Sequence, residues 1–138
     1  MTRQVSLAET LGRALDAMRD RAPSMYRALS AQLHIAATRL SVDDETVPLR
    51  SDGASIALDD GRAPFSVHVR SDRGTLLDVA AGRVDLVSAV LGDRLFVSGD
   101  VASLVALERA AALFVSWATC SPAAWPLFHR YRDDEGER

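Results

Sequence analysis

Three histidines and a single cysteine are the side chains of this sequence best suited to metal or nucleophilic chemistry. His34, His68 and His129 lie far apart, and none has a second histidine at the His-x-x-x-His spacing that places two zinc ligands on one helix face. Cys120 sits in "ATCSPAA", which holds neither a base nor a cation to activate a thiol. The residues therefore predict no metal, no cofactor and no catalytic residue, with Cys120 as a buried, inert thiol.

An enzymatic alternative stays open, because one polar group inside an apolar pocket can guide an isomerisation or a cyclisation, and the sequence would hide such a site. The candidates are His68, Asp78, Tyr26 and Tyr131. Asp78 is also explained as a residue at the start of a helix, like Asp85. Nucleotide binding is not indicated, because "SGD" at 98–100 lacks the further glycines of a phosphate-binding loop.

Composition indicates a single globular domain of 138 residues, with 48% hydrophobic and 25% charged residues. The net charge of −3 gives no electrostatic reason to expect a nucleic-acid partner. All sixteen basic residues are arginine, which a GC-rich bacterial genome explains. With one cysteine no intramolecular disulfide forms, and the N-terminal segment has no apolar core of signal-peptide length, so we expect a cytoplasmic protein.

One stretch approaches the length of a membrane span. Residues 110–129 carry no charged side chain when the histidine is neutral. Pro122 and Pro126 interrupt the second half of this stretch, and Glu108-Arg109 bounds the first, so we expect no spanning segment.

The first half of the chain predicts two helices followed by strands. Ser6-x-x-Glu9 has the form of a capping box, and leucines at helical spacing follow it as far as about Ala22-Pro23. A shorter helix is expected from about Ser24, leading into a strand-like segment at 33–42. Residues 54–69 predict an antiparallel hairpin that turns at 59–61, with Phe65, Val67 and Val69 on one face.

The second half predicts short helices, a strand and a long apolar helix. Thr75 is the expected N-cap of a helix that stops at Gly82, and Asp85 that of a helix closed by Gly92. The strand "RLFVS" follows, and Asp100 caps the last long helix. The charged end of the chain is expected to be a solvated tail.

The segment "TLLDVAAGRVDLVSAVLGDRLFVSGDVASLVAL" resembles the sterol-carrier-protein (type 2) family. The matching positions are Leu76, Leu77, Gly82, Ala89, Gly92, Leu95, Val97, Gly99 and Asp100. The resemblance implies an α+β fold: a single, mostly antiparallel, five-stranded sheet covered on one face by helices, here with two extra N-terminal helices. The carrier-like domain is expected at 32–128, preceded by N-terminal helices at 1–31, which depart from the family's pattern, and followed by a charged tail at 129–138.

Members of that family hold lipids, fatty acyl chains or other apolar molecules in a tunnel between sheet and helices, and they offer no catalytic motif to carry over. The resemblance therefore implies non-catalytic binding of a lipid-like, isoprenoid or polyketide-like molecule. Related domains are appendages of enzymes or accessory factors, so a docking role beside a larger enzyme remains an alternative. The residues expected to line the tunnel are Phe65, Val67, Leu76, Leu86, Val90, Phe96, Leu107, Phe114 and Trp117.

The long helix after Asp100 is apolar on two sides, whereas a helix that covers a core should have one polar face. One stripe contains Leu104, Leu107 and Phe114 and can pack on the sheet. The second stripe consists of Val101, Val105, Ala112 and Val115. It must meet an apolar ligand, the N-terminal helices or a second subunit in a homodimer, and these alternatives stay open.

Overall fold

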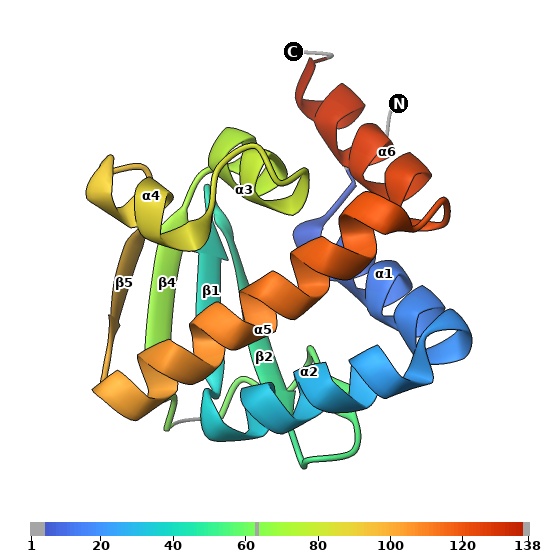
Figure 1. Cartoon of the computed structure of the whole chain (residues 1–138). Helices are drawn as coiled ribbons and strands as arrows, with labels where there is room; N and C mark the ends of the chain where they lie inside the picture. The colour runs from blue at the N-terminus through green and yellow to red at the C-terminus, as the bar shows by residue number, and fades with distance from the viewer. Residues whose placement is uncertain (1–4, 63, 137–138) are drawn as a thin grey trace.

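The computed structural model describes residues 5–62 and 64–136, which form six helices and five strands (Figure 1). The first four residues and the last two of the predicted tail lie outside the described residues. In chain order the elements are α1 (Leu7–Arg21), α2 (Pro23–Ile35), β1 (Thr38–Val42), β2 (Glu45–Ser51), β3 (Ile56–Ala57), β4 (Val67–Ser71), α3 (Arg73–Ala80), α4 (Leu86–Leu91), β5 (Phe96–Gly99), α5 (Val101–Cys120) and α6 (Ala124–Gly136).

The five strands form one mixed sheet in the order β3-β2-β1-β4-β5. The pairs β1–β2, β2–β3 and β4–β5 are antiparallel, and the central pair β1–β4 is parallel. The predicted α+β class with a mostly antiparallel five-stranded sheet is therefore confirmed, with one parallel pair at its centre.

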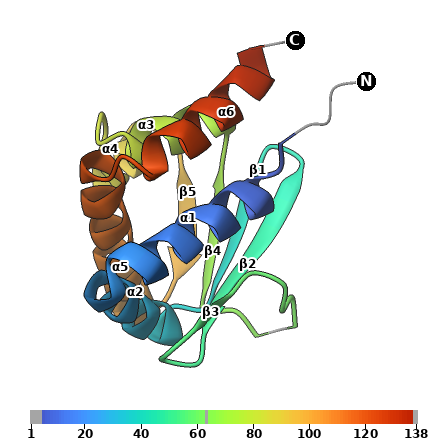
Figure 2. The same ribbon diagram turned by 90° about the vertical axis from the view of Figure 1, so that its right-hand side faces the viewer.

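Side chains of β1 and β4 alternate between a covered and an open face of the sheet. Leu40 and Val69 are register partners and both are buried, whereas Arg39 and its partner His68 are exposed. The helices α2 and α5 lie along the covered face and pack closely on each other (Figure 2). The core lies between this helical layer and the sheet. The other face of β1, β4 and β5 is open.

Most helix boundaries follow the predicted caps. Ser6, Asp85 and Asp100 each accept a hydrogen bond from the backbone N–H three residues on, as expected of N-caps. The N-cap of α3 is Asp72, so the prediction of Thr75 was wrong. Thr75 instead donates its hydroxyl to Asp72, which already accepts from the Thr75 backbone N–H.

The predicted hairpin at 54–69 was wrong. β3 pairs with β2, and β4 pairs with β1 and β5, so the two halves of the expected hairpin lie in different parts of the sheet. The hairpin that forms is β1–β2, with Asp43 in its turn at a positive φ of 53°. The sequence analysis did not predict β2. This strand contains Pro48, a residue that disfavours strand interiors and that here lies beyond the short stretch that pairs with β3.

Two further segments differ from expectation. The strand-like segment at 33–42 begins as the last turn of α2 and becomes strand only from Thr38. The predicted tail begins inside α6, where Tyr131 is buried, so at least this part of the charged segment packs on the domain.

Candidate ligand-binding site

An apolar cavity of about 150 Å³ lies between the covered face of the sheet and the helices. The sheet contributes Leu40 and Val69, and α5 contributes Leu107 and Phe114. The two lining hydroxyls, Thr38 and Ser71, already donate to backbone carbonyls, those of Ala36 at 2.8 Å and Arg94 at 3.1 Å. The cavity therefore offers a ligand hydrocarbon contact and almost no polar recognition.

Four of the nine residues expected to line a tunnel line this cavity, namely Leu76, Leu86, Leu107 and Phe114. Trp117 is buried and is not among the lining residues, but it packs beside Phe114, with ring centroids 5.8 Å apart. The roles of these five residues in ligand binding remain predictions.

The other four expected residues lie outside the lining for reasons of strand geometry and exposure. Phe65 precedes β4 and lies under the Arg50 guanidinium, whose carbon is 4.1 Å from the ring centroid. Val67 is fully buried in the core. Phe96 pairs with Arg70 and so faces the open side of the sheet, and Val90 is exposed on α4.

Sequence reasoning missed the contribution of the two N-terminal helices to this cavity. Leu11 and Leu15 from α1, and Leu29 and Leu33 from α2, are among its lining residues. The signal was present in the four-residue spacing of these leucines, which places each pair on one helix face. Leu11, Leu15 and Leu29 had been assigned to helices outside the carrier-like domain, and Leu33 to the start of that domain.

A groove of about 800 Å³ between α4 and α5 adjoins the cavity. Val79, Leu86, Ala111 and Val115 line both spaces, so the groove and the cavity share a wall of apolar side chains. Polar side chains stand among the other residues that line the groove: Arg83, Asp85, Ser88, Glu108 and Ser116. This arrangement suits a molecule with an apolar body and a polar end.

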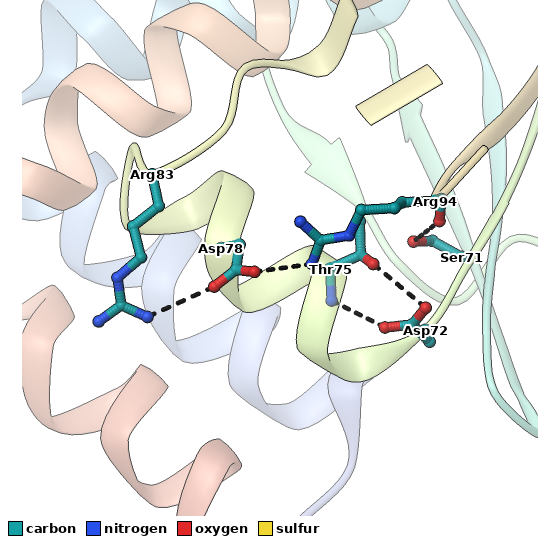
Figure 3. Close-up of polar contacts among 6 residues, drawn as sticks. All are labelled: Ser71, Asp72, Thr75, Asp78, Arg83 and Arg94. Carbon is teal, nitrogen blue, oxygen red and sulfur yellow. Dashed lines mark hydrogen bonds and ion pairs between the residues drawn. The ribbon is translucent and has the colours of Figure 1, made fainter. Parts of the chain in front are cut away.

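An ion-pair network fixes α3 beside this groove (Figure 3). Asp78 accepts from Arg94 at 2.7 Å and from Arg83 at 3.4 Å. The hydrogen bond from Arg94 holds the pKa of Asp78 below its usual value. Asp78 lies inside α3 and not at its start, so its interpretation as a helix-start residue was wrong.

None of the four candidate residues for an enzymatic role lines the cavity. The Tyr26 hydroxyl accepts from the Ile56 backbone N–H at 2.9 Å, and His68 is exposed on the open face of the sheet. Tyr131 is buried under the Arg73 guanidinium, 4.1 Å from the ring centroid, and this burial raises the pKa of Tyr131.

Cys120 is exposed, so its prediction as a buried thiol was wrong. It ends α5, where the helix leaves the core, and it lines a surface pocket together with Trp125 and His129, whose rings are stacked 4.9 Å apart. Among the side chains that the structure describes, within residues 5–62 and 64–131, no three histidine, cysteine or acidic side chains are grouped so as to hold a metal ion.

The second apolar stripe of α5 is not covered by the N-terminal helices. Val101 is 78% exposed and Val105 is 42% exposed, while Val115 borders the groove. α5 is long and apolar enough to cross a bilayer by length and composition alone, a test that core helices of soluble proteins also pass. In this fold the helix lies across the sheet, with its first stripe toward the cavity.

No family model matches the sequence, and no curated protein matches it either. Solved structures do match. A UbiJ-SCP2 ubiquinone synthesis protein aligns over 76% of this chain and 94% of its own, with 15% identity and a TM-score of 0.57. A conserved hypothetical protein from Thermus thermophilus, described as possibly a sterol carrier protein, aligns over 92% of both chains, with 20% identity and a TM-score of 0.57.

Sterol carrier protein 2 from Yarrowia lipolytica, in its apo form, aligns over 76% of this chain and 88% of its own, with 12% identity and a TM-score of 0.53. At identities of 12–20%, these matches show the fold alone. The chain therefore has the sterol-carrier-protein-2-like fold.

Proposed function

We propose that this protein binds and carries a lipid-like or other apolar small molecule, without chemistry, in the cavity between its sheet and helices. The observation that carries the proposal is the hydrocarbon lining of this cavity, in a fold shared with proteins named as sterol carriers. The exposed Cys120 forms no disulfide, which suits the reducing cytoplasm as the place of action.

The volume of the cavity limits what it holds in this conformation. At about 150 Å³ it matches an apolar cavity that takes benzene, and it is smaller than the 300 Å³ or more of typical ligand sites. A longer chain would extend past Ala111 and Val115 into the groove between α4 and α5, where its polar end would meet Arg83 or Ser88. In our proposal, this route from cavity to groove takes the place of the tunnel that the sequence led us to expect.

The binding energy expected for such a ligand suits a carrier. Burial of twelve methylenes contributes about 10 kcal/mol, against an association cost of about 4 kcal/mol or more. The remainder corresponds to roughly micromolar binding or weaker. A carrier must release its cargo, so modest affinity is what the role requires.

Native mass spectrometry of freshly purified protein, followed by extraction, tests the proposal directly. We expect a discrete added mass of lipid size. In a titration of delipidated protein with a fluorescent fatty acid, Ala111→Phe should weaken binding at least about tenfold, because the new ring fills the wall shared by cavity and groove.

Ala102→Phe is the matched control, since Ala102 is exposed on the same helix and lines neither space. This variant should bind like the wild type. Absence of any bound molecule together with no fatty-acid binding would contradict the proposal. A polar group of the cargo found altered after incubation would favour the enzymatic alternative instead.

A further inference from the structure

We propose that the β5 side of this molecule docks on an anionic membrane surface. Arginines on the open face of the sheet would bind lipid phosphates, and exposed apolar side chains of α4, β5 and the start of α5 would enter the interface. The inference rests partly on the proposed function, because α4 also borders the groove through which cargo would pass. Docking itself needs no cargo, so it is tested with the delipidated protein.

A basic patch occupies the open face of β1 and β4. Arg39 and His68 are register partners on adjacent strands, and Arg70 follows two positions along β4. Together with Phe96 they line a shallow hollow of about 380 Å³ whose described lining contains no acidic side chain. The protein as a whole has a net charge of −3, so this patch differs in sign from the molecule that carries it.

The two arginines of this patch are available to a partner. In the part of the chain that the structure describes, the Arg39 side chain makes no hydrogen bond or ion pair, and it is exposed. The Arg70 guanidinium contacts the Phe96 ring, with its carbon 5.8 Å from the centroid, and pairs with no described carboxylate. Arg83 and Arg94, by contrast, are both paired with Asp78.

Exposed apolar side chains lie on β5 and on the helices that precede and follow it in the chain. Leu91 at the end of α4 is 80% exposed, Phe96 on β5 is 53% exposed and Val101 at the start of α5 is 78% exposed. These three elements follow one another in the chain, and α4, β5 and the start of α5 lie along the same side of the molecule (Figure 1). β5 is also the last strand of the sheet, so no other strand covers this side.

The combination of charge and apolar surface favours a membrane over a nucleic acid. A single-stranded nucleic acid needs aromatic stacking platforms, of which this hollow offers Phe96 alone. An anionic bilayer accepts both features, because phosphates pair with arginine while aliphatic side chains enter the acyl boundary. Asp93 and Asp100 flank β5 and oppose docking, so we expect weak, salt-sensitive binding.

Vesicle flotation tests the inference. Delipidated protein is mixed with vesicles of phosphatidylcholine alone, or of phosphatidylcholine with about a third phosphatidylglycerol. We expect binding to the anionic vesicles that falls as salt is raised. Arg39→Gln/Arg70→Gln should lower the partition coefficient about 30-fold, and Leu91→Ser about tenfold.

The control is Arg21→Gln/Arg27→Gln, which removes the same charge from exposed positions on α1 and α2 and should change binding less than about twofold. Thermal unfolding verifies that each variant is folded. Equal binding to neutral and anionic vesicles would overturn the inference. Binding that is unchanged in Arg39→Gln/Arg70→Gln would also overturn it.

A labelled single-stranded RNA bound in place of vesicles, or a dimer formed without vesicle binding, would assign this face to another partner and would also overturn it. Loss of fatty-acid binding alone, with docking intact, would count only against the proposed function.

Discussion

At the scale of the residue, Asp78 shows how a carboxylate stabilises this fold without taking part in binding. Its hydrogen bond from Arg94 and its pairing with Arg83 join α3 to the segments on either side of α4. We expect Asp78→Asn to lower the free energy of unfolding at pH 7 by less than about 1 kcal/mol, because all three side chains are partly exposed. Urea denaturation measures the change, with the exposed loop residue Asp59→Asn as the control.

The same ion pairs predict how this contribution depends on pH. The pKa of Asp78 is lowered in the folded protein, so the carboxylate binds protons more readily when the chain is unfolded. Its stabilisation is therefore present above the unfolded pKa of about 4 and is lost as the pH falls through the lower folded value. The difference between wild type and Asp78→Asn should shrink progressively as the pH falls below about 4, and a difference that does not shrink in acid would contradict this account.

Residue-scale predictions from the sequence succeeded where the physics is local. Ser6, Asp85 and Asp100 were identified as N-caps because each bonds to a backbone group three positions away. Asp78 was misinterpreted because Arg94, from which it accepts its shortest hydrogen bond, lies sixteen positions further along the chain, and no local pattern signals this contact. Exposure of Cys120 likewise depends on where α5 leaves the core, which composition does not reveal.

At the scale of the element, the contact between β4 and β5 depends on Gly99. A Cβ built on Gly99 would lie 2.6 Å from the Ser66 carbonyl oxygen, which is backbone and cannot rotate away. We expect Gly99→Ala to destabilise the protein by about 1–3 kcal/mol, measured by thermal unfolding. Gly61→Ala is the control, because nothing lies within 4 Å of the added methyl group, and it should be neutral or slightly stabilising. Equal stability of the two variants would show that β5 can shift away from β4.

Element types were predicted more accurately than strand partners. The helical spacing of leucines and the caps placed the helices, whereas alternation in residues 54–69 identified apolar faces without showing which strands pair. The parallel β1–β4 pair joins segments that the chain separates by β2 and β3, so no local turn signals it. Four of the nine expected wall residues line the cavity because they share the covered face, and Phe96 does not because its strand position faces the other way.

At the scale of the whole molecule, the cavity couples ligand binding to global stability. Its walls come from the N-terminal helices, the sheet, α3, α5 and α6, so a bound apolar molecule contacts nearly every part of the fold at once. A ligand that binds only the folded chain stabilises it by about 2.7 kcal/mol at a hundred times its dissociation constant. For a protein of this size that corresponds to a rise in Tm of about 10 °C.

We therefore expect fatty acids to raise the Tm of the delipidated protein by roughly this amount, and the rise should increase with chain length until the groove is filled. Differential scanning calorimetry over a series of chain lengths measures it. Ala111→Phe should abolish most of the rise, because its ring would separate the groove from the cavity, while Ala102→Phe should retain it. A rise that survives Ala111→Phe would place the ligand outside this cavity, on a surface such as the exposed stripe of α5. The cavity-lining stripe and the exposed stripe lie on different sides of α5. Comparing Ala111→Phe with Ala102→Phe therefore shows which of these two surfaces binds the ligand.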